Sequence, residues 1–202
     1  MTAVPSLRGR IDAVVIGASA GGVEALSALL PAVPADSRAP VFVVLHLPRE
    51  RRSLLEEVFR GRCQAPVHEA SDKDPIEPGT VYFAPPDYHL LIEHGPSLAL
   101  SADVPVNFSR PSVDVLFESA ADVYKNRLLG VILTGASHDG AAGLAAVAAA
   151  GGMTVVQDPD SALVRTMVDA AVNRQPPDLV LPLDGIARLL GTLDRTGARQ
   201  PG

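Results

Sequence analysis

A serine stands in a turn of small residues close to the start of the chain. The stretch VVIGASAGG, residues 14–22, has the spacing G-x-S-x-G from Gly17 to Gly21, with Ser19 in the middle. This spacing mounts a nucleophilic serine on a tight strand-to-helix turn. Backbone N–H groups at such a turn, here including that of Ala20, can hold an oxyanion. A turn that merely needs small residues would show the same short pattern.

A nucleotide site fits this turn poorly. The dinucleotide fingerprint G-x-G-x-x-G needs a glycine where Ser19 stands, and an acidic residue should end the second strand, where this chain has His46. A P-loop would need Gly-Lys-Ser/Thr, which does not follow. We therefore expect no cofactor at this turn and give nucleotide binding little weight.

Two further side chains follow apolar runs and complete a set that can do nucleophilic chemistry. His46 ends the run PVFVVLH, and Asp139 follows the run GVILTG. A serine needs a base, and the base needs a group that orients it. Taken alone, His46 would be a structural residue at the end of a strand, and Asp139 would be the cap of the following helix. Together with Ser19 they indicate a catalytic triad, with the neighbouring His138 as a less favoured base.

These side chains need a scaffold that brings strand ends together. Apolar runs alternate with amphipathic stretches, which predicts a doubly wound α/β fold with a mostly parallel sheet, helices on both faces and a β-hairpin insertion. Functional groups should gather beyond the carboxyl ends of the strands. The expected strands are residues 11–17, 40–46, 128–135, 153–158 and 178–182, with hairpin pieces at 81–84, 89–93 and 98–101. The expected helices are residues 22–33, 51–60, 112–125, 139–152, 160–172 and 183–193. We expect one domain over residues 1–202, with its core at about 11–190.

Composition excludes several classes of protein. The chain has 202 residues and a net charge of −6, which argues against nucleic-acid binding, and Arg49, Arg51 and Arg52 are expected to be a solvated helix start. The single cysteine, Cys63, excludes a disulfide framework and is expected to be a packed or surface thiol. No apolar stretch suggests membrane insertion or a signal peptide, so we expect a cytoplasmic protein.

No metal site is expected either. The histidines outside the proposed triad lack the spacing of metal ligands, and those of the hairpin are expected to face solvent or to be locally hydrogen-bonded. These histidines are His68, His89, His94 and His138.

Six stretches, in order along the chain, resemble one known family. They are IGASAGGVEAL, VVLHLP, PGTVYFAPPDYHLLI, NFSRPSVDVLFESAA, GVILTGASHDGAAGL and GGMTVVQDPDSA. The resemblance is to the catalytic domain of the chemotaxis protein-glutamate methylesterases, the CheB family, and it runs over about residues 11–190.

This resemblance implies a doubly wound α/β domain in a bacterial signalling system. It implies hydrolysis of γ-glutamyl methyl esters on the cytoplasmic helices of methyl-accepting chemoreceptors, and deamidation of certain receptor glutamines. The family's serine, histidine and aspartate fall on Ser19, His46 and Asp139. A backbone N–H that helps to hold the oxyanion falls on Ala136. Arg110 matches a position near the site, where it contacts substrate or only braces a helix start.

The chain also departs from the family pattern. Ala20 stands where threonine is common, Ala136 where methionine is usual, and Val168 where a proline is frequent. The resemblance therefore does not define the substrate pocket of this chain. Few residues precede the first strand, so we expect no receiver domain and no switching by phosphorylation in cis. A separate response regulator is then a candidate partner. The alternative function is a catalytically inactive CheB-like binding or adaptor module.

Overall fold

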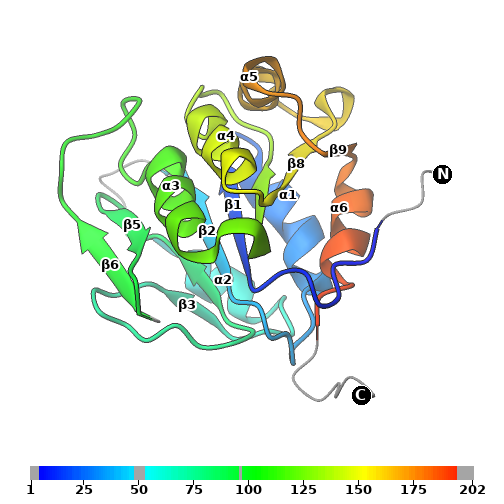
Figure 1. Cartoon of the computed structure of the whole chain (residues 1–202). Coiled ribbons are helices and arrows are strands. Elements are labelled where there is room, and N and C mark those ends of the chain that lie inside the picture. The colour runs from blue at the N-terminus through cyan, green and yellow to red at the C-terminus, as the bar shows by residue number, and fades with distance from the viewer. Residues whose placement is uncertain (1–4, 48–52, 96, 195–202) are drawn as a thin grey trace.

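A parallel β-sheet forms the centre of the molecule (Figure 1). The structure, a computed structural model, describes residues 5–47, 53–95 and 97–194. Within them a seven-stranded sheet has the order β3-β4-β2-β1-β7-β8-β9, and each neighbouring pair is parallel. Its strands are β1 (Ala13–Ala18), β2 (Val41–Leu45), β3 (Val67–Glu69), β4 (Val81–Phe83), β7 (Leu128–Ile132), β8 (Met153–Gln157) and β9 (Leu179–Leu181).

The central strands are apolar throughout because both faces of the sheet are covered. Every residue of β1, β2 and β7 is buried. Continuous apolar runs are typical of such parallel strands, since side chains on both faces enter a core. The expected doubly wound α/β fold is confirmed.

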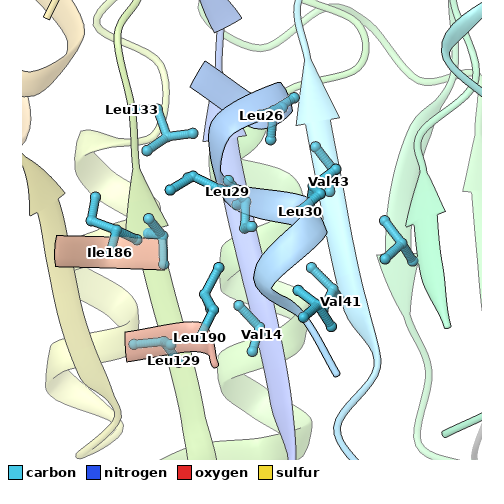
Figure 2. Packing of buried hydrophobic residues seen from close by; sticks show 14 of the residues in the cluster. Val14, Leu26, Leu29, Leu30, Val41, Val43, Leu129, Leu133, Ile186 and Leu190 are labelled. Atoms are coloured by element: carbon cyan, nitrogen blue, oxygen red, sulfur yellow. The ribbon is translucent and has the colours of Figure 1, made fainter. Parts of the chain in front are cut away.

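Helices divide between the two faces. The α-helices are α1 (Gly22–Leu29), α2 (Leu55–Arg60), α3 (Val113–Tyr124), α4 (Ala141–Ala149), α5 (Thr166–Arg174) and α6 (Leu183–Leu190). Short 3₁₀ turns are η1 (Leu30–Ala32), η2 (Lys125–Arg127) and η3 (Pro159–Ser161). Helices α1, α2 and α6 pack on one face, where Figure 2 shows leucines of α1 and α6 against β1, β2 and β7. Helices α3, α4 and α5 pack on the other.

The predicted hairpin insertion is present, but only two of its three expected pieces belong to it. Residues 81–84, expected as a hairpin piece, contain β4, which pairs parallel with β2 and β3 in the main sheet. Strands β5 (His89–Ile92) and β6 (Leu98–Ser101) pair antiparallel, outside the main sheet. Leu90, Ile92 and Leu98 are buried in the same cluster as α3. In Figure 1 the hairpin lies beside α3, at the edge of the molecule.

Three further local expectations differ from the structure. Strand β3 was not expected, because its three residues are too few to show a periodic pattern in the sequence. The helix expected from residue 160 begins at Thr166, since Gln157 holds the turn at Ser161 and the N–H of Val164 bonds to Thr134. In the helix expected over 51–60, the described part begins at Leu55; Arg49, Arg51 and Arg52 lie outside the described residues.

The strand order reverses direction next to β1. From β1 the chain moves outward through β2, and it later returns to β7 on the other side of β1. In open α/β sheets, ligands bind beyond the carboxyl ends of the strands at such a reversal. Ala18 pairs with Leu45 and Gly17 with Ile132, so the residues after β1, β2 and β7 meet at this edge.

No helix within the described residues is long and apolar enough to cross a membrane.

Replacing Leu29 by Ala should destabilise the fold by about 2–5 kcal/mol, because a fully buried leucine leaves a cavity. Leu29 belongs to the cluster between α1 and the sheet (Figure 2). Urea denaturation measures the change. The matched control is Leu54→Ala, at a leucine that is 53% exposed, where the change should stay within about 0.5 kcal/mol. Equal losses in both variants would contradict the assigned core.

Candidate active site

Ser19 lies in the turn between β1 and α1, at the carboxyl edge of the sheet. Its backbone N–H donates to the carbonyl of Thr134 (3.0 Å), and its carbonyl accepts from Gly22 (2.8 Å). Gly21, the N-cap of α1, has φ +79°, in the left-handed region that favours glycine. These contacts fix the turn to the end of β7 and leave Ser19 half-buried.

His46 follows β2 directly and lies beside the serine turn. Its backbone N–H donates to the carbonyl of Ala18 (3.1 Å), which continues the parallel pairing of β1 and β2 by one residue. The imidazole is 13% exposed, and its Nε2 lies 2.8 Å from Oδ2 of Asp139. Register therefore places His46 next to Ser19, and a side-chain contact joins it to Asp139.

Asp139 is fully buried and its carboxylate is surrounded by donors. Oδ2 accepts from His46 and from the backbone N–H of Val113 (2.6 Å). Oδ1 accepts from the hydroxyl of Ser112 (2.7 Å), the side-chain amide of Asn107 (3.1 Å) and the backbone N–H of Asp114 (3.2 Å). Val113 and Asp114 begin α3, so the carboxylate sits at the positive end of that helix.

These donors decide the charge of Asp139. Burial alone would raise the pKa of its carboxyl, but the hydrogen bonds from His46, Ser112, Val113 and Asn107 outweigh burial and hold the pKa below its ordinary value. An ionised carboxylate can only accept a hydrogen bond, so Nε2 of His46 carries the proton of that contact. The other ring nitrogen, Nδ1, is then the basic one.

The structure contains one of the two side-chain contacts that a Ser-His-Asp relay needs. His46 and Asp139 are hydrogen-bonded. The hydroxyl of Ser19 makes no side-chain hydrogen bond with His46 or with any other residue that the structure describes. Catalytic hydrogen bonds are often long without substrate and tighten when it binds. The arrangement places an imidazole, whose Nδ1 has no hydrogen-bond partner among the described residues, beside a serine on a tight turn.

Two expected oxyanion donors lie at the same edge. Ala20 and Ala136 are exposed, and within the described ranges neither backbone N–H donates a hydrogen bond. Gly135 packs against the serine turn, because a β-carbon added there would lie only 2.8 Å from Cβ of Ser19. The carbonyl of Gly135 accepts from Met167, which ties this loop to α5. Both N–H groups are thus available on short, braced segments next to Ser19.

Arg110 is held by the protein itself. Its Nε and Nη2 donate to Oδ1 of Asp87 (3.0 and 2.7 Å), and Nη1 donates to the carbonyls of Ala102 and Asp103 (2.7 and 3.0 Å). The guanidinium therefore braces the segment that leads from β6 into α3. A contact with substrate stays a prediction.

The other candidate groups lie outside this arrangement. His138 is exposed and, within the described residues, makes no hydrogen bond with Ser19 or Asp139. His89 was expected to face solvent or bond locally, but it is only 2% exposed; it accepts from the N–H of Ser112 and contacts the carbonyl of Val104. Burial raises the pKa of Cys63 to about 11, which disfavours the thiolate. The described residues hold no group of three or more His, Cys, Asp or Glu suited to a metal ion.

Sequence reasoning missed several groups around Asp139. Ser112 and Asp114 stand at the start of a predicted helix, where a polar cap is ordinary, and nothing in the sequence links them to Asp139. Asn107 lies in an irregular segment that shows no periodicity. Only the contact between α3 and the loop after β7 reveals their roles.

Comparison with known proteins bears on this geometry. The sequence model described as CheB methylesterase matches residues 14–190. The chain belongs to the CheB methylesterase family. This confirms the resemblance drawn from the six sequence stretches.

Individual relatives agree with that assignment. The chain is 43% identical over 189 residues to a protein of Leptospira interrogans named putative protein-glutamate methylesterase/protein-glutamine glutaminase, covering 94% of this chain and 98% of that protein. It is 38% identical over 181 residues to a protein-glutamate methylesterase/protein-glutamine glutaminase of Trichodesmium erythraeum, covering 88% of this chain and 51% of that one. The crystal structure of the Thermotoga maritima CheB methylesterase catalytic domain superposes with a TM-score of 0.86 at 33% identity, covering 90% of this chain and 97% of that one.

Replacing Asp139 by Asn should reduce the free energy of unfolding by an amount that shrinks as the pH falls. The pKa of folded Asp139 lies below the ordinary 3.8. Its ionised form therefore contributes stability that is fully present above the unfolded-state value and is lost as the pH falls through the folded-state value. Urea denaturation of both proteins from about pH 7 down to about pH 3 measures this difference.

The control is Asp184→Asn. A hydrogen bond from Arg188 lowers the pKa of Asp184, but that carboxylate is exposed, so its pH-dependent contribution should be much smaller. A loss in the Asp139 variant that stays constant over the whole range would show that the charge of Asp139 is not what its donors stabilise.

Proposed function

We propose that this CheB-family domain hydrolyses γ-glutamyl methyl esters on the cytoplasmic helices of methyl-accepting chemoreceptors and deamidates glutamines there. The single observation that carries the proposal is the hydrogen bond between His46 and the buried carboxylate of Asp139, beside the turn that presents Ser19. The relatives named for both activities support the same reaction. Hydrolysis of an ester and of a primary amide differ only in the leaving group, methanol or ammonia.

The mechanism follows from the arrangement of the three side chains. Nδ1 of His46 takes the proton as Oγ of Ser19 attacks the ester carbonyl. Asp139 holds the Nε2–H and stabilises the imidazolium. The imidazolium returns the proton to the departing oxygen, and methanol leaves. Water, activated by the same imidazole, then cleaves the acyl-enzyme, which frees the glutamate and restores the Ser19 hydroxyl.

Backbone donors stabilise the charge that forms in between. The N–H groups of Ala20 and Ala136 receive the oxyanion, since both lie next to Ser19 and neither has a partner among the described residues. Because these donors are backbone groups, alanine serves at both positions. The reaction needs no metal and no cofactor.

The cellular setting follows from the substrate. Receptor methyl esters lie on cytoplasmic helices, so the domain would act in the cytoplasm. A separate response regulator is the proposed regulatory partner. Arg110 remains a proposed substrate contact only through its place near the site, because its donors are already used within the protein.

A non-enzymatic adaptor is the second candidate, and the Ser19 hydroxyl, which has no hydrogen bond to His46 here, is the observation that favours it. A serine-reactive fluorophosphonate separates the two functions. Labelling at Ser19 that requires His46 supports an activated nucleophile. An unlabelled, folded protein supports the adaptor.

Ser19→Ala should abolish methanol release from a methylated chemoreceptor cytoplasmic fragment, with a loss on the order of 10⁴-fold or more in turnover. The fold should persist, because the Ser19 contacts that hold the turn are made by its backbone. Ser27→Ala on α1 is the matched control and should keep wild-type activity, since within the described part of the chain its hydroxyl bonds only to Val23 of α1 and to Arg62. Undiminished hydrolysis by the Ser19 variant would refute the nucleophile.

Ala136→Pro should lower kcat by about 10²–10³-fold, because proline has no N–H to offer the oxyanion. Ala136→Gly keeps the N–H and serves as the control, and circular dichroism checks that both variants fold. If the proline variant folds and turns over as fast as the glycine variant, the Ala136 N–H does not hold the oxyanion.

A further inference from the structure

Asp139 and Asp114 cap each other's helices. Asp139 precedes α4, yet its carboxylate accepts the first N–H groups of α3, from Val113 and Asp114. Asp114 lies in the first turn of α3, yet its Oδ1 accepts the N–H of Gly140 (2.9 Å), the N-cap residue of α4, and the N–H of Gly143 (2.6 Å), in the first turn of α4. The carboxylate at the start of each helix therefore accepts N–H groups at the start of the other helix. These N–H groups have no partner within their own helix.

The hydrogen bonds of each aspartate side chain also involve the backbone of the other aspartate. The N–H of Gly140 belongs to the peptide that joins it to Asp139, so Asp114 holds the main chain of Asp139 directly. In return, Asp139 accepts the N–H of Asp114 (3.2 Å). A shift of either residue would break the contact made by the other.

One amide joins the two carboxylates. Nδ2 of Asn107 donates to Oδ2 of Asp114 (2.7 Å) and to Oδ1 of Asp139 (3.1 Å). An amide nitrogen has two hydrogens, one for each carboxylate. Asn107 thereby keeps two buried acids at a set separation.

We propose that Asp114 is a positioning residue of the active site, which holds the Asp139 carboxylate against His46 through the exchanged helix caps and the amide of Asn107. This inference rests on the proposed function only for its effect on turnover. The hydrogen-bond network itself is independent of the reaction.

The surroundings of Asp114 and Asp139 shift the pKa values of the two carboxyls in opposite directions. Burial raises the pKa of Asp114, the N–H of Gly143 opposes the rise, and the charge of Asp139 adds to it. The pKa of Asp139 is lowered instead, so Asp114 takes up a proton first as the pH falls. The titratable groups that face Asp114 are Glu118 on its own helix, Asp139 with His46 behind it, and His138, Asp169 and Arg174. The last three line a cleft of about 600 Å³ with Asn107, Asp114 and Thr166.

Two substitutions test the network separately. Asp114→Asn keeps an oxygen for the N–H groups of Gly140 and Gly143, but it turns an NH₂ group toward the amide of Asn107 and breaks the bridge. Asn107→Ala removes the bridge and leaves both helix caps intact. Asp169→Asn is the matched control, because it removes one carboxylate from the same cleft and does not bond to Asp139.

Kinetics on a methylated receptor fragment should show a lowered kcat with a nearly unchanged KM. A displaced base costs between about 10-fold and about 100-fold in turnover. The double variant should lose no more than Asp114→Asn alone, because both changes break one bridge. Asp169→Asn should behave as wild type. Full kcat in folded Asp114→Asn and Asn107→Ala would overturn the proposal, and losses that multiply in the double variant would do the same.

A second readout does not need activity. Proton NMR should show a downfield signal from the Nε2–H of His46 bonded to Asp139, identified by its absence in His46→Gln. That signal should disappear or move upfield in Asn107→Ala and in Asp114→Asn, and stay in place in Asp169→Asn. An unchanged signal overturns the positioning role. Should Asp114→Asn fail to fold, Asn107→Ala decides alone. A wild type that shows the signal but releases no methanol fails the proposed function and leaves the positioning role supported.

Discussion

A buried negative charge organises this protein's candidate active site. A fully buried carboxylate such as Asp139 is costly unless donors surround it. The start of α3 supplies backbone N–H groups and the positive end of a helix, and Ser112 and Asn107 add side-chain donors. With those donors in place, Oδ2 of Asp139 also accepts from Nε2 of His46, and that contact decides which imidazole nitrogen is basic.

The hairpin insertion and the segment after it contribute to the surroundings of this one carboxylate. The chain from β6 to α3 delivers Asn107 and Ser112 to Asp139, and Arg110 braces that segment against Asp87. His89, on β5, accepts the N–H of Ser112 and so connects the hairpin to the same network. Elements that look peripheral in Figure 1 therefore reach the centre of the site.

Polar groups with hydrogen-bond partners and polar groups without them lie in different parts of the described structure. Every buried side-chain nitrogen and oxygen in the described residues has a hydrogen-bond partner. At the carboxyl edge of β1, by contrast, the Ser19 hydroxyl and the N–H groups of Ala20 and Ala136 have none among those residues. Satisfied groups hold the scaffold still, while groups left open beside it can serve a substrate. This edge is also where the strand order reverses, between β1 and β7.

The sequence by itself determined the fold class, the central strands, the family and the residue types at the strand ends. Continuous apolar runs report burial on both faces, and that signal is local. The tertiary structure decided the strand order, the short β3, the late start of α5, and the donors around Asp139. Ser112 and Asn107 lie 27 and 32 residues from Asp139 along the chain, and His46 lies 93 residues away. No local pattern encodes such contacts, because they exist only once packed helices and strands bring distant polar groups to the same buried charge.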